Sequence, residues 1–465
     1  MQGSRKQLIR GLLPIVFGLF VIVVVVVVIP QAVKYIGKAA GVPANIVVNY
    51  EGILGKMPTP WRNLAQGGEE SNDMIAPVVN ETKALKPEYI RIDHIYDHFN
   101  VVSRSSDGGL TYDWSGLDAA VNSILATGAK PMLSLSYMPT AISKGDILEV
   151  PKDWNEWGQV VQATITHFSG RNQRNLDGVA YEVWNEPDLF GSYKVYGDKN
   201  YLTMYDVASR AAMNVRDTNL FEIGGPATTG LYQNWLQTLI KYVAKNNLRM
   251  DFISWHRYST DLDVFANDAK QARSWAENIP ALVNLKFYVT EWGFDSEVNA
   301  DYDTKFSAVH TIAASRMMMG AIDRAFAFEV KDGPGPQKFW GRWGLLTNEK
   351  YGAPEKKPRY SAFLFLNSLD NTRLGVTGEG SWVKAIGSED DSGNVKLLVV
   401  NYDSKKIHSE AVPITFENLP SMNFKYTRTD FLGGTRSLKI ATTSASWKTV
   451  EYMDPNSAAI ISLDF

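Results

Sequence analysis

The chain has 465 residues, of which 45% are hydrophobic, and a formal net charge of -3. This length can bury a large core and favours more than one domain, while the balanced charge provides no basic field of the kind that binds nucleic acid. Cysteine is absent, which excludes disulfides, thiol catalysis and cysteine-ligated metal.

The segment from Leu12 to Val33 is almost wholly apolar and contains an unbroken valine run from Val23 to Val28. It has about the ~20 residues that cross a bilayer. We therefore expect residues 1–40 to form a cytoplasmic tail and a single transmembrane anchor, with basic residues on both sides giving only a slight orientation bias. A cleaved signal peptide is the alternative, although its apolar region usually has only ~7 to 15 residues. The absence of cysteine fits a bacterial or archaeal exterior better than a eukaryotic one.

Eight apolar segments with the character of strands alternate with helical patterns. They are Ile46–Tyr50, Tyr89–Ile92, Pro131–Ser136, Val179–Trp184, Glu222–Gly225, Asp251–Trp255, Phe287–Thr290 and Ala325–Phe328. This alternation predicts a (β/α)8 barrel over residues 41–358. A doubly wound open sheet is the alternative, but no glycine-rich phosphate loop follows the first segment.

Helical spacing is clearest between Trp154 and Phe168, where apolar residues recur every three or four positions. Asp153 and Glu156 form a candidate cap at its start. Further helices are expected at Asp118–Ala126, Tyr201–Val215, Gln233–Lys245, Val264–Ala276 and Phe306–Met319.

The composition changes after Lys357 and Pro358. A helical segment, Ser361–Leu369, is followed by short β-like runs that glycine, asparagine and aspartate interrupt. The runs are Trp382–Ile386, Val395–Asn401, Ala411–Phe416, Phe424–Thr429, Val450–Tyr452 and Ala459–Leu463. This pattern predicts an antiparallel β-sandwich over residues 359–465.

Two of the barrel segments end in a glutamate next to tryptophan. In YEVWNEPDLF, Glu186 precedes Pro187, which cannot continue the ladder of hydrogen bonds; in FYVTEWGF, Glu291 precedes Trp292. A (β/α)8 barrel collects the carboxyl ends of its strands on one face. Glycoside cleavage needs one carboxylic acid to protonate the departing oxygen and a second carboxylate to attack or to activate water. The two glutamates are therefore candidates for such a pair.

The motifs W-N-E-P and T-E-W-G resemble those of the retaining glycosidases of glycoside hydrolase family 39, and most of all the endoglycosidases that accompany bacterial exopolysaccharide systems. The resemblance extends from about Ile46 to the end of the chain. It implies that Glu186, on the fourth strand, is the general acid/base and that Glu291, on the seventh, is the nucleophile. Asn185 would bind the 2-hydroxyl of the reacting sugar.

Other strand ends fit the same family pattern. Arg91 would keep the nucleophile ionised, although it is alternatively a buried partner of Asp93. The segment S-W-H-R-Y resembles the family element H-x-Y, which implies that Tyr258 donates to the nucleophile and that His256 lines the subsite. The predicted substrate-binding residues, from the resemblance and from the aromatics near the expected mouth of the barrel, are Arg91, Asn185, His256, Tyr258, Trp292, Tyr137 and Trp340.

The eighth strand departs from the family pattern, since Phe328 and Glu329 stand where a tryptophan is expected. Trp340 and Trp343 follow later, as candidates for the floor of the subsite. Trp184 and Trp255 are expected to fill the core. Five loop aromatics are candidates either for stacking on sugars or for covering the edge of the core: Tyr96, Phe99, Tyr137, Phe190 and Tyr193.

His94 and His98 are four residues apart, as in H-E-x-x-H zinc motifs, but the glutamate is missing and the segment follows a strand. We expect them to line a pocket, and we predict neither a metal nor a cofactor.

These features predict a retaining glycoside hydrolase held in the cell membrane by one span, with its catalytic domain outside the cytoplasm. It would cleave an extracellular polysaccharide or oligosaccharide, in mid-chain, by double displacement. The alternatives are an exo-acting glycosidase and a non-hydrolytic glycan-binding component of a polysaccharide export or synthesis system. The expected partners are a carbohydrate and the membrane, without nucleic acid, and the sequence identifies no protein partner.

Overall fold

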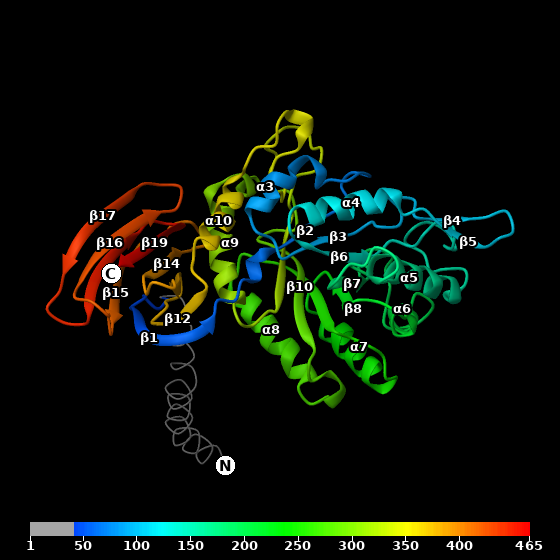
Figure 1. Ribbon diagram of the computed structural model, residues 1–465, viewed down its shortest axis with the longest axis horizontal. Helices are drawn as coiled ribbons and strands as arrows, with labels where there is room; N and C mark the ends of the chain where they lie inside the picture. Colours follow the sequence, from blue (N-terminus) through cyan, green and yellow to red (C-terminus); the bar gives the residue numbers. More distant parts are fainter. Residues whose placement is uncertain (1–40) are drawn as a thin grey trace, which may run out of the picture.

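The computed structural model describes residues 41–465, in which a closed barrel lies beside a curved β-sheet (Figure 1). The expected anchor, Leu12–Val33, lies outside the described residues. From residue 41 onward, no helix combines the length and the apolar character that crossing a membrane requires.

Eight parallel strands form the barrel, in the order β10-β11-β2-β3-β6-β7-β8-β9. They are β2 (Asn63–Gln66), β3 (Tyr89–Ile92), β6 (Lys130–Leu135), β7 (Val179–Val183), β8 (Phe221–Thr228), β9 (Phe252–Tyr258), β10 (Lys286–Gly293) and β11 (Arg324–Phe328). The helices are α3 (Val79–Ala84), α4 (Ser115–Ala126), α5 (Trp154–Ser169), α6 (Tyr201–Asn214), α7 (Gln233–Lys245), α8 (Asp263–Ala276), α9 (Lys305–Met318) and α10 (Pro358–Asn367). The predicted barrel is confirmed.

The start of α5 shows how the sequence sets a local boundary. Asp153 is extended, and its side chain accepts a hydrogen bond from the backbone N–H of Asn155 at 2.9 Å. This satisfies one of the free N–H groups of the first turn. Glu156, expected to complete the cap, instead forms an ion pair with Arg104 at 2.7 Å.

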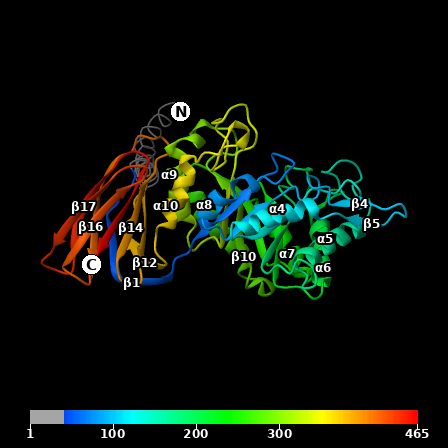
Figure 2. The ribbon, with the colours of Figure 1, turned by 45° about the horizontal axis from the view of Figure 1, so that its top comes forward.

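The prediction that Ile46–Tyr50 forms the first barrel strand is wrong. This segment begins β1 (Ile46–Lys56), which pairs antiparallel with β12 (Thr372–Thr377) and parallel with β15 (Glu410–Glu417). Figure 2 shows this blue strand among the orange and red strands of the C-terminal sheet.

The burial patterns agree with this placement. In β1 buried and partly exposed residues alternate at its start, as in a sheet with one covered face, whereas all four residues of β2 are buried. Strand β2 carries Asn63 and Gln66 at its ends, so it lacks the apolar run by which the other barrel strands were predicted.

The C-terminal region forms one curled nine-stranded sheet, in the order β17-β16-β19-β14-β13-β12-β1-β15-β18. Its remaining strands are β13 (Val383–Glu389), β14 (Val395–Asn401), β16 (Asn423–Asp430), β17 (Thr435–Ala441), β18 (Trp447–Met453) and β19 (Ser457–Asp464). The sheet is mixed, because β1 runs parallel to β15, so the predicted antiparallel sandwich is wrong in this respect. Strand β17 was not predicted because its first three residues are polar and only Leu438 and Ile440 alternate with a polar residue.

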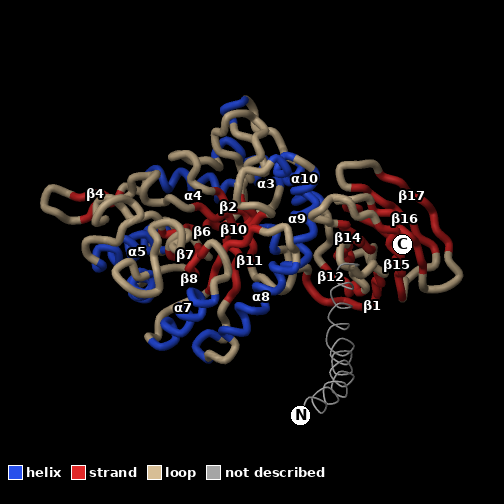
Figure 3. Tube along the Cα trace, turned by 180° about the vertical axis from the view of Figure 1, so that it is seen from behind, coloured by secondary structure: helices blue, strands red, loops and turns tan. Residues whose placement is uncertain are grey.

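Helices α9 and α10 lie between the barrel and the sheet, as Figure 3 shows from behind. One hydrophobic cluster contains barrel residues together with Ile386, Leu398 and Ile460 of the sheet. Arg316 of α9 also donates to the backbone oxygen of Ala385 at 2.9 Å. The sheet is therefore joined to the barrel by a continuous core.

The interior of the barrel is filled by apolar and aromatic side chains, which form a buried cluster. Its buried members are Ala65, Tyr89, Met132, Ala180, Phe252, Tyr288, Phe326 and Phe328. A packed interior leaves the carboxyl ends of the strands as the place where polar side chains can converge.

Candidate active site

A cleft of about 720 Å³ opens at the carboxyl ends of the barrel strands. Each of the eight strands contributes at least one lining residue, at its end or just beyond it. In chain order, one residue from each is Gly67, Asp93, Tyr137, Asn185, Thr229, Tyr258, Glu291 and Phe328. This volume lies in the range of small-molecule sites in proteins.

Glu186 and Glu291 meet in this cleft, with His256 between them. Nδ1 of His256 lies 2.8 Å from Oε1 of Glu186 and 3.5 Å from Oε2 of Glu291. A carboxylate oxygen of each glutamate and a ring nitrogen of the histidine all lie within 4.8 Å of one another. Carboxyl groups about 5 to 5.5 Å apart are typical of retaining glycosidases, whereas inverting enzymes leave room for a water between them.

A tight turn directs Glu186 into the cleft. Trp184 and Glu186 both have positive φ values, of 73° and 44°, which non-glycine residues rarely adopt. The backbone N–H of Glu186 donates to the carbonyl of Ala227, near the C-terminal end of β8, at 3.0 Å. Strained backbone of this kind persists only where the surrounding structure imposes it, and it is concentrated at functional sites.

Two donors hold the carboxylate of Glu291. Nη1 of Arg91 lies 3.0 Å from Oε1, and the hydroxyl of Tyr258 donates to Oε2 at 3.0 Å. Burial raises the pKa of Glu291 to about 7, against the charges of His256 and Arg91, which act to lower it.

Arg91 is fully buried and binds three groups through one guanidinium. Nε donates to Glu182 at 2.6 Å and Nη2 donates to the side-chain oxygen of Asn185 at 2.7 Å, while Nη1 faces Glu291. Its ion pairs are therefore with Glu182 and Glu291, and the alternative pairing with Asp93 is not formed. The planar guanidinium suits such a fork, which fixes the three partners relative to one another.

Glu182 was not predicted. It is completely buried in β7, and its second oxygen has no hydrogen-bond partner among the described residues. A signal was present, because Glu182 follows Ala180, an inward-facing residue, by two positions, and side chains two apart share one face of a strand.

Asn185 is held at both ends of its amide. Its oxygen accepts from Arg91, and its Nδ2 donates to the hydroxyl of Tyr137 at 2.9 Å. Tyr137 and Asn185 both line the cleft, as does Tyr258. The structure thus brings together six of the predicted residues around Glu186 and Glu291: Arg91, Asn185, Tyr137, His256, Tyr258 and, next to them, Phe190.

Two predicted residues lie elsewhere. Trp292 is buried and packs edge-on against Phe265 of α8, with ring centroids 6.1 Å apart, because it points away from the face that carries Glu291. Trp340 does not line the cleft; Trp343 does, packed against Phe328 with ring centroids 5.1 Å apart. The prediction that Trp292 and Trp340 line the substrate site is therefore corrected.

An ion pair that no motif indicated lies on the wall with Phe328 and Trp343. Nε of Arg342 donates to Glu69 at 2.7 Å, and its guanidinium lies over the ring of Trp343. Nearby, Glu329 is fully buried and accepts from Gln66 at 2.8 Å. Burial raises the pKa of Glu329 well above its ordinary value, and the charge of Glu69 raises it further.

The other aromatics and histidines divide between cleft and core. Tyr96 and Tyr193 are buried, and Trp184 and Trp255 fill the core as predicted. His94 lines the cleft and stacks on His98, with ring centroids 4.1 Å apart, while its Nδ1 lies 2.7 Å from Asp97. Asp97 thus orients His94 toward the cleft wall.

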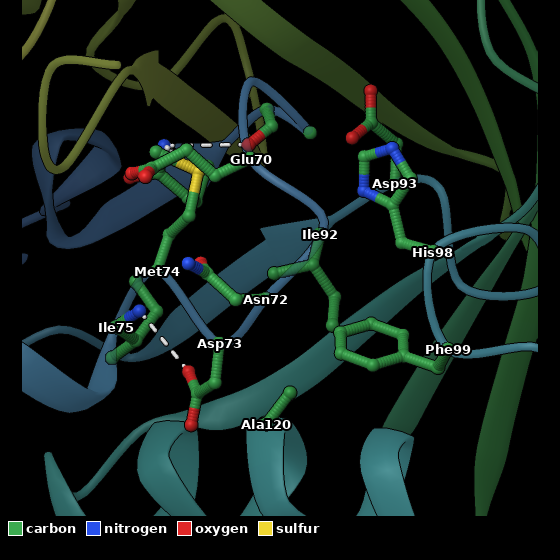
Figure 4. Close-up of a pocket in the computed structure, with 13 residues that line it drawn as sticks. Glu70, Asn72, Asp73, Met74, Ile75, Ile92, Asp93, His98, Phe99 and Ala120 are labelled. Carbon is green, nitrogen blue, oxygen red and sulfur yellow. Dashed lines mark hydrogen bonds between the residues drawn. The ribbon is translucent and has the colours of Figure 1, made fainter. Parts of the chain in front are cut away.

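A much smaller cavity, of about 30 Å³, adjoins the cleft through Gly67, Gly68 and Asp93 (Figure 4). His98 and Phe99 lie on its wall, and Asp73 accepts from the backbone N–H of Ile75 at 3.1 Å. Such a volume suits about one water molecule. The larger cleft is therefore the candidate site for a substrate.

Comparisons with known proteins give one family and one fold. The model of "Glycosyl hydrolases family 39" matches residues 61–416. A β-xylosidase of Caldicellulosiruptor saccharolyticus is 29% identical over 368 residues, which is 72% of this chain and 74% of that protein.

The solved structures agree with the fold. A monomeric β-xylosidase of Caulobacter crescentus CB15 has a TM-score of 0.73 at 21% identity, covering 90% of this chain and 99% of that chain. The GH39 enzyme of Xanthomonas axonopodis pv. citri has a TM-score of 0.72 at 19% identity, covering 91% of this chain and 97% of that chain. The C. saccharolyticus relative and the C. crescentus structure are named β-xylosidases, not the exopolysaccharide-associated endoglycosidases that the sequence resemblance indicated.

Proposed function

The chain belongs to glycosyl hydrolases family 39, a family of retaining glycosidases that hydrolyse O-glycosyl bonds, and on that basis we propose that it is an exo-acting β-xylosidase. The observation that carries this proposal is the approach of Glu186 and Glu291 within 4.8 Å in a cleft, with Arg91 and Tyr258 donating to Glu291. The names of the relatives favour the exo-acting alternative over cleavage in mid-chain.

In the proposed first step, Glu291 attacks the anomeric carbon while Glu186 donates a proton to the departing oxygen. The bond between the anomeric carbon and that oxygen breaks, and a glycosyl ester forms on Glu291. Arg91 and Tyr258 keep the attacking carboxylate ionised and oriented, since donors to the charged form stabilise it.

In the second step, Glu186 accepts a proton from a water molecule, whose oxygen attacks the anomeric carbon and releases Glu291. Two inversions give net retention. Nδ1 of His256 lies 2.8 Å from Glu186. It can therefore form a hydrogen bond with Glu186 both before and after Glu186 gives up its proton. Asn185, held by Arg91 and Tyr137, is our candidate for binding the 2-hydroxyl.

Trapping tests this function directly. A 2-deoxy-2-fluoro-β-xyloside with a good leaving group should inactivate the protein with time, and peptide mapping should locate the label on Glu291. Labelling of another residue would remove the assignment of the nucleophile. Xylotetraose separates exo from endo action, because an exo-acting enzyme releases xylose first, whereas early xylobiose without xylose would favour mid-chain cleavage.

We also propose that the protein is held in a membrane, with the barrel outside the cytoplasm. The support is the apolar sequence from Leu12 to Val33. Full-length protein should then remain in the membrane fraction after alkaline carbonate washing, and a variant beginning at residue 41 should not. Release of the full-length protein by the wash would contradict this location.

A further inference from the structure

Apolar side chains are exposed on one wall of the cleft. Leu189 is 57% exposed, Tyr232 is 43% exposed and Phe190 is 38% exposed, and all three line the cleft. Single exposed apolar residues are common on protein surfaces, but a group of them in a cleft beside catalytic carboxylates marks a contact surface for a ligand.

The barrel order decides which part of a substrate this wall meets. Phe190 follows β7 and Tyr232 follows β8. These strands lie across the barrel from β11, which carries Phe328, and from β2, which is followed by Glu69. Glu186 also follows β7. Because the acid must reach the oxygen of the leaving group, the leaving group lies on this side of the cleft.

The position of Phe190 is tied to that of Glu186. The backbone N–H of Phe190 donates to the carbonyl of Glu186 at 2.7 Å, which closes a turn of five residues. The carbonyl of Phe190 accepts from Nε1 of Trp184 at 3.1 Å, and its ring packs edge-on against Tyr137, with centroids 5.8 Å apart. The same turn therefore sets both the acid and the aromatic ring.

Tyr232 is connected to the same turn through Asp188. The carboxylate of Asp188 accepts from the backbone N–H of Thr229 at 3.1 Å, and the hydroxyl of Thr229 lies 2.9 Å from that of Tyr232. The loops after β7 and β8 are thus clamped together. Rings fixed before binding cost less ordering entropy when a ligand arrives.

We propose that Phe190 and Tyr232 form a leaving-group subsite that binds the sugar residue next to the one transferred to Glu291. A pyranose carries C–H groups on its faces and hydroxyls at its rim, so its faces pack on exposed aromatic rings while the rim stays in water. This inference rests on the proposed function and extends it: the natural substrate is an oligosaccharide whose second sugar contributes to recognition, instead of a sugar with a small leaving group.

Two substrates that differ only in the leaving group test the subsite. The leaving group of xylobiose is a xylose residue. The leaving group of β-xylosyl fluoride is a fluoride ion, which is too small to touch either ring. For Tyr232→Ala and Phe190→Ala, we expect kcat/KM to fall about 3- to 10-fold for xylobiose, the size of one lost ring contact, and by less than about 2-fold for the fluoride. Tyr196→Ala is the matched control, since Tyr196 is 67% exposed and does not line the cleft.

Tyr232→Phe separates the ring from its hydroxyl. This variant keeps the ring face and loses the contact with Thr229, so it should retain most of the wild-type rate on xylobiose. Equal losses on both substrates, no loss on xylobiose, or a Tyr232→Phe variant as impaired as Tyr232→Ala would each overturn the subsite. Failure of the wild-type protein to hydrolyse xylosyl fluoride would instead remove the proposed β-xylosidase function. Melting temperatures of all variants should match that of the wild type.

Discussion

Nη1 of Arg91 lies 3.0 Å from Oε1 of Glu291, although 200 positions separate the two residues in the chain. The contact spans the barrel from β3 to β10, and the same guanidinium binds Glu182 and Asn185 of the region that carries Glu186. The buried guanidinium of Arg91 therefore fixes the positions of the two proposed catalytic residues relative to each other.

Glu186→Gln should separate protonation from nucleophilic attack. The amide cannot donate an acid proton, so we expect kcat/KM for xylobiose to fall by about 10²- to 10⁴-fold. Substrates with a leaving group that needs no proton, such as a dinitrophenyl xyloside, should still form the glycosyl ester. Added azide should then restore turnover and yield a β-xylosyl azide, detectable by mass spectrometry and NMR.

Glu291→Gln provides the contrast. It removes the nucleophile, so azide should not yield a product of retained configuration from any substrate. The surface variant Glu277→Gln is the control, since Glu277 is exposed just after the C-terminal end of α8 and does not line the cleft. The assigned roles would be contradicted if azide restored turnover in neither cleft variant. They would also be contradicted if azide gave a product of the same configuration with both variants.

The pH profile should report the ionisation of Glu291. The nucleophile acts as a carboxylate, and burial raises its pKa to about 7. We therefore expect kcat/KM for xylosyl fluoride to fall as the pH decreases through about 7, because protonated Glu291 cannot attack. A profile that stays flat down to pH 5 would contradict a raised pKa for this group.

Arg91→Lys should shift the acidic limb of the kcat/KM profile, where activity falls as Glu291 is protonated, to higher pH. Lysine keeps one positive charge but cannot reach Glu182, Asn185 and Glu291 together, so Glu291 loses part of the interaction that lowers its pKa. The limb should shift upward, and kcat should decrease at every pH. Circular dichroism spectra should match those of the wild type, since the buried charge of Glu182 keeps a partner.

Glu329→Gln should make stability less dependent on pH. Burial raises the folded-state pKa of Glu329 above its unfolded value of about 4.3. The stability associated with its protonated form is then fully present below that unfolded value and is lost as the pH rises toward the folded-state pKa. The glutamine stays neutral, so the variant should melt at a higher temperature than the wild type at pH 8 and at a similar temperature at pH 4.

Ile46→Ala should test the place of β1 in the C-terminal sheet. Ile46 is completely buried in the sheet core, and its truncation should cost about 2 to 5 kcal/mol of unfolding free energy. Ile53, on the same strand, is 59% exposed, so Ile53→Ala should change stability by no more than about 0.5 kcal/mol. Denaturant melts of the two variants give the comparison, and equal stabilities would argue against the pairing of β1 with β12 and β15.

The sequence by itself determined the elements whose signals are local. Apolar runs marked seven of the eight barrel strands, and helical spacing marked α4 to α9 within a few residues. Glu186 and Glu291 could be predicted as a pair because each ends such a strand, and parallel strands in a barrel end on one face. Arg91, Asn185 and Tyr258 followed from the same strand ends and from the resemblance to the family.

Tertiary structure alone decided which distant segments meet. Nothing local distinguishes β1 as a member of the C-terminal sheet, because a strand's hydrogen-bonding edge accepts any partner that the rest of the fold brings beside it. Tertiary structure also decided that Trp343 lines the cleft and Trp340 does not. It likewise brought Arg342 to Glu69, and it placed Phe190 and Tyr232 in one cleft. Their positions depend on loops between strands, whose paths are set by long-range packing and not by the period of the residues within them.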